Sequence, residues 1–363
     1  MKLCEFTRAP ASSHAMSVLG LDSPLKRCIF VGYVLLWVSS HLLIYASKRA
    51  GAPDFNATSV VLLTELIKLI MATSFYVTYD GSLAQMVQAT RDSVPLLLKY
   101  AVPALLYCVY NNLVYINLST FDPGTYNVLM QARIVMTGVL YQVLFTKRLS
   151  RNQWLGIVLI TLGCMCKEAD KLTSSASLSA SVRAWLLLLA QLLASVFAGV
   201  YTELLLKGGD GGLARGVTTN LQNAYMYLHS IVWNGAFLMA QGRLSEAVAH
   251  ENLAAICTPT ILAIMAIMSS VGLVTGYFLK HLDSVLKNIA AATEVVLTML
   301  ASAALFGTEL NETGLVAALL VAAGVALYAR PVAPARPPLP APDAPSVEEE
   351  SQGLLRNEKD TSR

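Results

Sequence analysis

The segment YCVYNNLVYINLSTFDPGTYNVLMQARIV, residues 107–135, combines the apolar character of a buried helix with polar groups that such a place excludes. Asn111, Asn112, Gln131 and Arg133 lie between long apolar runs. Burying amides and a guanidinium costs free energy unless these groups are paired or bind something. The solvent around this segment therefore decides how the whole chain is interpreted.

The composition of the chain identifies that solvent as lipid. Of its 363 residues, 55% are hydrophobic and only 13% are charged, whereas soluble domains carry about 25% charged residues. A net charge of +3 is too small for a nucleic-acid-binding surface, so no nucleic-acid partner is expected. The six cysteines lack paired metal-ligand spacing, and we expect neither a metal nor a cofactor. The first 27 residues contain no apolar core of a cleaved secretory signal.

Apolar stretches of membrane-spanning length recur along the chain. A helix needs about 20 apolar residues to cross the ~30 Å hydrocarbon core of a bilayer. The sequence predicts about ten such helices, at residues 28–47, 57–79, 94–116, 122–146, 153–168, 184–206, 218–240, 258–279, 284–306 and 312–330. Asp122 and Pro123 supply turn chemistry between the third and the fourth of them. The predicted fold class is therefore an all-α integral membrane protein.

Lys and Arg residues near the helix ends favour a topology with both termini in the cytosol. The strongest element of this asymmetry is the cluster of Lys147, Arg148 and Arg151. Residues 331–363 are proline-rich and then acidic, and they cannot bury enough apolar area to fold. We expect them to form a disordered cytosolic tail.

Short signals for sorting and modification occur at a few positions. Glu350 followed by Leu354 and Leu355 resembles an acidic dileucine sorting signal, with two leucines in a disordered tail as the alternative. Asn56 and Asn311 match the N-glycosylation sequon. Both asparagines lie close to predicted membrane ends, so heavy use of either site is not expected.

An internal repeat relates residues 120–163 to residues 281–324 without a gap, at a shift of 161 residues. The matched pairs are Asp122 with Asp283, Thr137 with Thr298, Phe145 with Phe306, Leu149 with Leu310, Leu159 with Leu320 and Gly163 with Gly324. Five helices, an odd number, separate the two copies, so they would lie upside down relative to each other. Inverted repeats are a signature of secondary transporters, whose substrate site lies between the halves. The alternative is a chance alignment of apolar helices.

The expected organisation follows from this repeat. It comprises a cytosolic segment at 1–27, a five-helix repeat at 28–168, a luminal loop at 169–182, a second five-helix repeat at 183–330 and the tail at 331–363.

Four charged residues in the predicted spans have partners at helical spacing. Glu65 and Lys68 are three residues apart, and Glu203 and Lys207 are four apart. Such spacings bring opposite charges together on one helix face. The sequence therefore predicts an ion pair within each of these two helices.

Arg133 and Lys287 have no acidic residue at such spacing. Intramembrane cations without local partners are typical of substrate pathways. Arg offers phosphate a planar bidentate fork and Lys a point charge, so the pair suits a phosphate ester. The alternative is a buried ion pair between Arg133 and Glu294, the residue that the repeat aligns with it.

Amide and tyrosine side chains near Arg133 are candidates for recognising the rest of such a ligand. Amides bind the edges of a base or the hydroxyls of a sugar, and tyrosines provide stacking faces with a polar tip. The candidates in this region are Asn111, Asn112, Tyr115, Tyr126 and Gln131. Hydrogen bonding between helices is the alternative role for the amides.

A third polar cluster opens the predicted helix at 218–240. Asn220 is placed to cap this helix. Asn223 lies one turn further in, where a capping role fails. Asn223 therefore joins the candidate substrate-binding residues.

These motifs resemble those of the nucleotide-sugar transporter family, in the branch that carries CMP-sialic acid, UDP-galactose and UDP-N-acetylglucosamine. The matching motifs are Asn111-Asn112, Thr125-Tyr126-x-Val128-x-x-Gln131-x-Arg133-Ile134, Arg148-Leu149-Ser150-x-x-Gln153-Trp154, Thr64-Glu65-Leu66-Ile67-Lys68, Gly199-Val200-Tyr201-x-Glu203-x-x-x-Lys207 and Leu279-Lys280-x-x-Asp283-x-x-x-Lys287. Together they cover the second to the tenth predicted span.

The resemblance implies a ten-helix inverted-repeat fold in the Golgi or endoplasmic-reticulum membrane. It implies that nucleotide sugar enters the lumen in exchange for nucleoside monophosphate, with UDP-galactose as the preferred cargo and CMP-sialic acid as the alternative. Arg133 and Lys287 fall on the family's two functional lysines, the first of them at the nucleotide phosphate. Asn112, Tyr126 and Asn223 fall on substrate-lining positions. Tyr201 and Glu203 join the candidates through their motif.

The sequence departs from the family pattern at positions that affect the identity of the cargo rather than the positive charge at its phosphate. Gln131-Ala132-Arg133 stands where the family has Gln-Leu-Lys, and Ser284, Asn288 and Gln222 replace family residues near the other motifs. The cationic character at the phosphate survives the first change. The others leave the sugar and the base open.

Two further readings of the chain remain. A membrane-bound glycosyl- or phosphotransferase would need a metal-binding carboxylate cluster, and the predicted loops at 80–93 and 169–182 are short and poor in His and Asp. We therefore do not expect this chain to be an enzyme. A transport-inactive scaffold for glycosyltransferases is the other alternative, and self-association also stays open.

Overall fold

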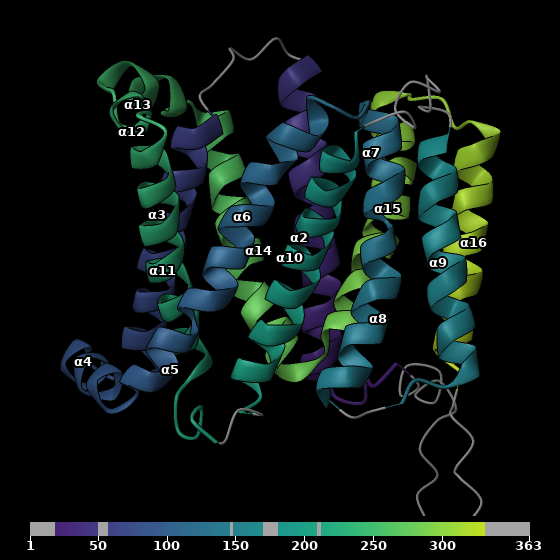
Figure 1. The fold of residues 1–363 in the computed structure, drawn as a ribbon. Coiled ribbons are helices and arrows are strands. Elements are labelled where there is room, and N and C mark those ends of the chain that lie inside the picture. The colour runs from purple at the N-terminus through teal and green to yellow at the C-terminus, as the bar shows by residue number, and fades with distance from the viewer. Residues whose placement is uncertain (1–18, 50–56, 146–147, 170–180, 209–211, 331–363) are drawn as a thin grey trace, which may run out of the picture. The chain divides into compact units, whose positions relative to one another are not determined.

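The computed structural model describes residues 19–49, 57–145, 148–169, 181–208 and 212–330. Within these ranges all regular structure is helical (Figure 1). The helices are α2 (Pro24–Arg49), α3 (Ala57–Phe75) with its π-helical continuation η2 (Tyr76–Asp80), α4 (Leu83–Asp92), α5 (Val94–Lys99), α6 (Ala101–Leu118), α7 (Pro123–Met130), α8 (Ala132–Phe145), α9 (Arg151–Ala169), α10 (Val182–Leu206), α11 (Thr219–Ala240), α12 (Leu244–Ala247), α13 (His250–Ile256), α14 (Pro259–His281), α15 (Ser284–Phe306) and α16 (Glu312–Tyr328).

Seven helical segments of this part of the chain are long and apolar enough to cross a membrane by length and composition. They are Pro24–Ser47, Ser59–Asp80, Val94–Leu118, Gly124–Phe145, Val182–Leu206, Pro259–His281 and Ser284–Phe306. The apolar helix α16 is shorter, and it packs along α9, while α11 packs against α3 and α6. The fold is thus that of a helical integral membrane protein, and the full number of spans stays a prediction.

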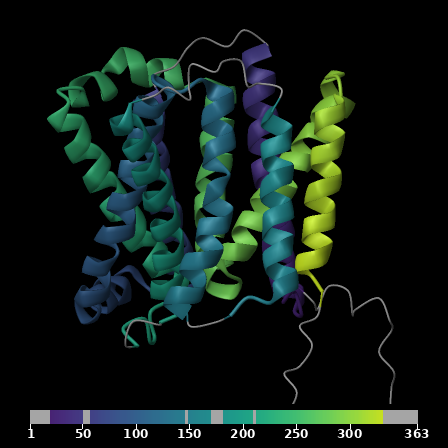
Figure 2. The same cartoon turned by 45° about the vertical axis from the view of Figure 1, so that its right-hand side comes forward.

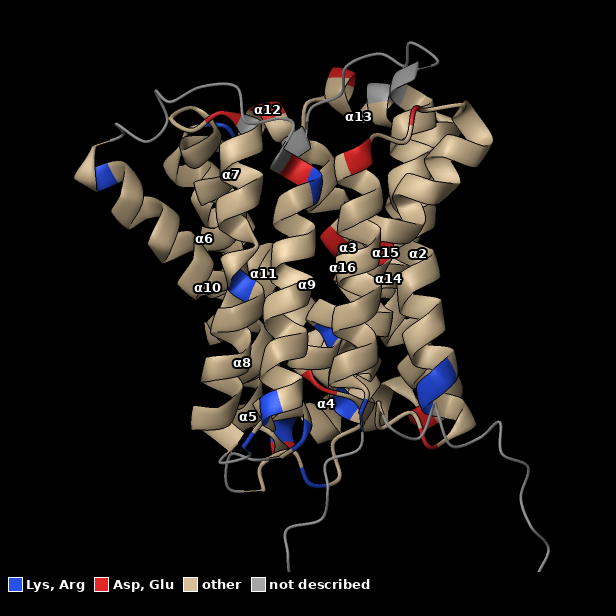
Figure 3. Ribbon diagram, turned by 90° about the vertical axis from the view of Figure 1, so that its right-hand side faces the viewer, with Lys and Arg blue, Asp and Glu red and all other residues tan. Residues whose placement is uncertain are grey.

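The long helices alternate in direction. Followed along the chain in Figures 1 and 2, the start of α2 and the end of α16 lie at the same end of the bundle as α4 and α5. Figure 3 shows most of the Lys and Arg residues at this end too. The positive-inside rule assigns such an end to the cytosol.

Aspartate caps begin two of the central helices. The Asp122 carboxylate accepts a hydrogen bond from the Thr125 amide at 3.0 Å, and Pro123 occupies the first turn of α7. The Asp283 carboxylate accepts from the Leu286 amide at 2.7 Å at the start of α15. The turn predicted before the fourth span is confirmed, and the two aspartates aligned by the repeat perform the same task.

The helices α9 and α16 approach each other through residues without bulky side chains. A Cβ on Gly156 would lie 2.7 Å from the Gly324 carbonyl oxygen, and one on Gly163 would lie 3.0 Å from the Ala317 carbonyl oxygen. Small residues let membrane helices pack backbone to backbone. The shift of 161 residues aligns Gly156 with Ala317 and Gly163 with Gly324. The contact of Gly156 with Gly324 therefore corresponds to the contact of Ala317 with Gly163, and the structure contains both.

Two local expectations differ from the structure. The predicted loop at 80–93 forms α4, whose start is a capping box between Ser82 and Gln85. A search for apolar runs of membrane-spanning length misses this short polar helix. Thr218 rather than Asn220 caps α11, since its hydroxyl accepts from the Leu221 amide at 3.3 Å.

Candidate functional site

Arg133 of α8 and Lys287 of α15 both lie within electrostatic range of one tyrosine of α2. The charges of both residues act on the hydroxyl of Tyr33, which is 5% exposed. Among the described residues, neither cation forms an ion pair. The two predicted phosphate-binding cations, one from each proposed half, thus share one buried phenol within range of their charges.

A glycine of α10 makes room for the Lys287 ammonium. A Cβ on Gly199 would lie 3.4 Å from Lys287 Nζ and 3.9 Å from the Tyr107 hydroxyl oxygen. Tyr107 also interacts electrostatically with Tyr33. The site thus includes Tyr107, one of the tyrosines in the opening segment, and Tyr33, which sequence reasoning missed because no local motif marks it.

Glu294, the alternative partner of Arg133, has other contacts. Its Oε1 lies 2.7 Å from His41 Nδ1 of α2 and accepts a hydrogen bond of the same length from the Thr298 hydroxyl. Glu294 is 5% exposed. The ion pair with Arg133 is therefore not formed, and the guanidinium has no carboxylate partner in the part of the chain that the structure describes.

A second charged group lies beside Tyr107 at α3. Lys68 Nζ donates to Glu65 Oε1 at 2.7 Å, which confirms the predicted pair. The ammonium lies 5.7 Å from the centroid of the Tyr227 ring, a cation–π distance. Its charge also acts on Tyr107. Tyr107 therefore lies between Lys287 on one side and, on the other, the charged pair of α3 and Tyr227 of α11.

Glu203 belongs to the junction of three helix ends. Its Oε1 accepts from Lys207 Nζ at 2.7 Å, which confirms the second predicted pair. Its Oε2 accepts from the backbone amide of Ser284 at 2.7 Å. Because Glu203 is 0% exposed, this predicted substrate-binding carboxylate contacts the start of α15 in this conformation.

A buried amide connects Tyr126 to the neighbouring helices. Gln191 of α10, 0% exposed, donates to the Tyr126 hydroxyl at 2.7 Å. Its Oε1 accepts from Asn117 Nδ2 at 2.7 Å. The Arg133 charge acts on Tyr126, so this phenol lies on the Arg133 side of the site. Sequence reasoning missed Gln191, although one glutamine in an apolar span is itself a signal.

The α6 candidates are spread over the surface of that helix. Asn112 Nδ2 donates to the Cys108 carbonyl of its own helix at 2.8 Å. Asn111 is exposed. The side chain of Tyr115 lies outside the described part of the structure. A substrate-binding role for these three residues remains a prediction.

The other candidates occupy three separate places. Gln131 lies at the break between α7 and α8 and is half-buried. Tyr201 packs beside the cluster of Tyr100 and Tyr225. Asn223 lies against α14, where a Cβ on Gly276 would be 2.0 Å from its Oδ1. Between described residues, no hydrogen bond joins Gln131 or Asn223 to Arg133 or Lys287.

The remaining predicted signals fall mostly outside the described ranges. Asn56 and the Glu350–Leu355 segment lie there. Asn311 caps α16, since its Oδ1 accepts from the Gly314 amide at 3.1 Å.

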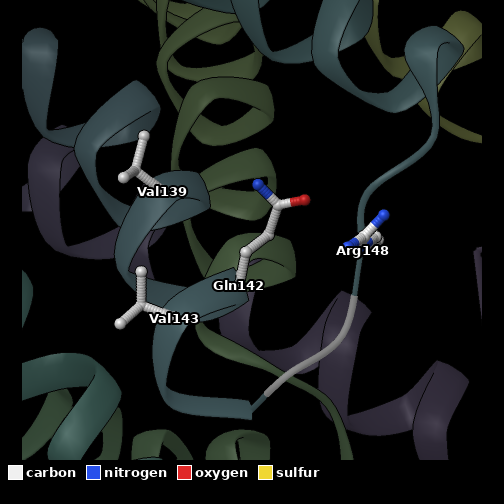
Figure 4. Close-up of a pocket in the computed structure, with 4 residues that line it drawn as sticks. All are labelled: Val139, Gln142, Val143 and Arg148. Carbon is white, nitrogen blue, oxygen red and sulfur yellow. The ribbon is translucent and has the colours of Figure 1, made fainter.

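A separate cavity of about 450 Å³ opens beside α8. Figure 4 shows its lining residues, which are Val139, Gln142, Val143 and Arg148. Gln142 Oε1 accepts from the Leu149 amide at 2.7 Å. This cavity contains no predicted site residue, so it is not the candidate site.

The fold defines a helical integral membrane protein whose described part carries charged side chains within its helix bundle. The chain belongs to the nucleotide-sugar transporter family, whose sequence model matches residues 21–329.

Curated relatives carry transporter names. The chain is 35% identical over 336 residues to the UDP-galactose transporter senju of Drosophila melanogaster, which covers 83% of this chain and 85% of the fly protein. It is 28% identical over 306 residues to CMP-sialic acid transporter 2 of Oryza sativa subsp. indica, covering 84% and 83%. It is 29% identical over 339 residues to the mouse UDP-galactose translocator, covering 88% and 83%.

A solved crystal structure shares the fold. It superposes with a TM-score of 0.62 over 83% of this chain and 95% of that chain, at 14% sequence identity. At this identity the likeness concerns the fold alone.

Proposed function

We propose that this protein is an antiporter that carries a UDP-sugar, with UDP-galactose as the preferred cargo, into the Golgi lumen in exchange for nucleoside monophosphate. The observation that carries the proposal is that neither Arg133 nor Lys287 has a carboxylate partner in the described residues, while the charges of both reach Tyr33. Two phosphates supply the missing negative charge. The names of the fly and mouse relatives favour UDP-galactose.

Exchange follows from the cost of an empty site. Without an anion, two cations stay uncompensated in a medium of low dielectric constant, so reorientation of the empty carrier is slow. A bound nucleotide removes that barrier in both directions. Two inverted five-helix halves would rock about the site, and the aspartate caps and the α9–α16 crossing that obey the repeat support this arrangement.

The location and the partners are part of the same proposal. Both termini face the cytosol, and the cation-rich end seen in Figure 3 supports this orientation. The nucleotide sugar is bound and released without cleavage, so the protein is a carrier rather than an enzyme.

The test is uptake of labelled UDP-galactose by full-length protein in liposomes, with and without UMP inside. Internal UMP should accelerate uptake. Arg133→Gln and Lys287→Gln should each reduce uptake about ten- to hundredfold, the range of one charge-assisted hydrogen bond, while the protein stays folded by circular dichroism. Arg183→Gln is the matched control, because Arg183 is exposed and near the start of α10 at the opposite end from α4.

Other outcomes would reject parts of the proposal. Equal uptake with and without internal UMP would reject exchange, and undiminished uptake by both glutamine variants would reject the role of the cations. Stronger competition by CMP than by UMP would favour a CMP-sugar, the cargo named for the rice relative. Transport of no nucleotide sugar would favour a scaffold for glycosyltransferases, and cleavage of the labelled cargo would favour an enzyme.

A further inference from the structure

The start of α15, which bears Lys287, is held by carboxylates from two elements. Asp283 caps it from within the chain by accepting from the Leu286 amide. Glu203 of α10 accepts from the Ser284 amide at 2.7 Å. Negative groups at a helix N-terminus satisfy its free amides and interact favourably with its dipole. The first turn of α15 is therefore fixed to α10, and Lys287 lies at the end of that turn.

Two lysines strengthen the same junction in a reciprocal way. Lys207, at the end of α10, donates to the carbonyl of Leu282 after α14, as well as to Glu203. Lys280, at the end of α14, donates to the carbonyl of Leu206, the last residue of α10. Each lysine thus satisfies a terminal carbonyl of the other helix. The corner between α14 and α15 cannot shift without breaking these contacts.

The Lys287 side chain returns to the same face of α10. Its Nζ lies beside Gly199, which is one turn before Glu203. Residues four apart share a helix face. One face of α10 therefore holds the backbone of Ser284 through Glu203 and provides the space for the Lys287 ammonium through Gly199.

We propose that Glu203 is a positioning residue: its carboxylate fixes the first turn of α15 on α10 and thereby sets the place of the Lys287 ammonium, without binding cargo itself. This inference rests on the proposed function, in which Lys287 binds the nucleotide phosphate. Both carboxylate oxygens of Glu203 are engaged by protein donors, and the residue is 0% exposed. A phosphate would also repel a carboxylate in its binding site.

The first test is a double-mutant cycle on the uptake of labelled UDP-galactose by full-length protein in liposomes. Glu203→Ala leaves the Ser284 amide without its acceptor and should raise KM about tenfold with a smaller change in maximal rate. Glu203→Gln retains an acceptor and should rescue most of this loss. In the background of Lys287→Ala, where residual uptake is measured at high substrate concentration, Glu203→Ala should change KM no further. Additive effects would overturn the proposal, as would a glutamine variant as impaired as the alanine variant.

The second test does not depend on transport. Reductive dimethylation of the purified protein followed by mass spectrometry reports the accessibility of each lysine amine. Glu203→Ala should change the labelling rate of Lys287 severalfold, whereas Glu294→Gln, a buried acid on α15 that contacts His41 instead, should not. An unchanged rate for Lys287 overturns the positioning role even if transport is confirmed. A changed rate in a protein that moves no nucleotide sugar would support positioning and reject the proposed function.

Discussion

At the scale of single residues, Ser284 presents an unusual contrast between its backbone and its side chain. Its amide is bound by Glu203, whereas its hydroxyl is buried and has no hydrogen-bond partner within the described part of the chain. A buried polar group without a partner costs about 1–3 kcal/mol. The hydroxyl therefore weakens a junction that the backbone strengthens.

Ser284→Ala should accordingly leave the melting temperature of the detergent-solubilised protein unchanged or raise it, because it removes only the unpaired hydroxyl. The matched control is Ser59→Ala. The buried Ser59 hydroxyl donates to the Ala247 carbonyl at 2.7 Å, so its loss should lower the melting temperature. Equal losses in both variants would mean that the Ser284 hydroxyl has a partner.

Residue pairs on one helix could be predicted from the sequence, and pairs between helices could not. The Glu65–Lys68 and Glu203–Lys207 ion pairs follow from helical spacing alone. The partner of Glu294 on another helix is His41, which is 253 residues away in the chain. No spacing rule reaches across such a distance, because the contact depends on how α2 and α15 pack.

At the scale of helices, the long apolar segments were predictable because a bilayer imposes their length. Each predicted span falls on one helix or on two consecutive helical segments, such as α7 and α8. The short helices α4, α12 and α13 were not predicted, since they lie outside the apolar runs. Only part of the candidate site could be predicted from the sequence. Arg133 and Lys287 stood out as charges without local partners, whereas the positions of Tyr33 and Gln191 depend on packing between helices.

The contact between α9 and α16 gives a second stability prediction. Gly156→Ala should lower the melting temperature, since its Cβ would lie 2.7 Å from the Gly324 carbonyl oxygen and overpacking costs about 1–3 kcal/mol. Gly235→Ala in α11 is the control, because nothing lies within 4 Å of a Cβ placed there. Alanine there should be neutral or stabilising by up to about 1 kcal/mol.

This comparison has a clear opposite outcome. If Gly156→Ala is as stable as Gly235→Ala, the helices α9 and α16 must separate freely, and close backbone packing does not hold them together.

At the scale of the whole molecule, the ends of the helix bundle differ in charge. Most Lys and Arg residues lie at the end with α4 and α5, and α12 and α13 lie at the other end (Figures 1 and 3). The bias predicts which end faces the cytosol. Counting Lys and Arg near the predicted helix ends favours the same orientation only imperfectly, because cations also occur at the opposite ends.

Cysteine labelling tests this orientation. In a variant without native cysteines, Ala84→Cys in α4 should react with a membrane-impermeant maleimide in cells whose plasma membrane alone is permeabilised. Glu251→Cys in α13 should react only after all membranes are dissolved. Both positions are exposed. The reverse pattern would invert the topology and, with it, the direction of transport.

The crossing of α9 and α16 has a meaning beyond packing. A contact that is the same from either side is the kind that two copies of one polypeptide form in an isologous dimer. Gly156 of α9 contacts Gly324 of α16, and Ala317 of α16 contacts Gly163 of α9. Each helix therefore contributes equivalent residues to the contact. The two helices thus form, inside one continuous chain, a self-complementary seam like that between the subunits of a homodimer.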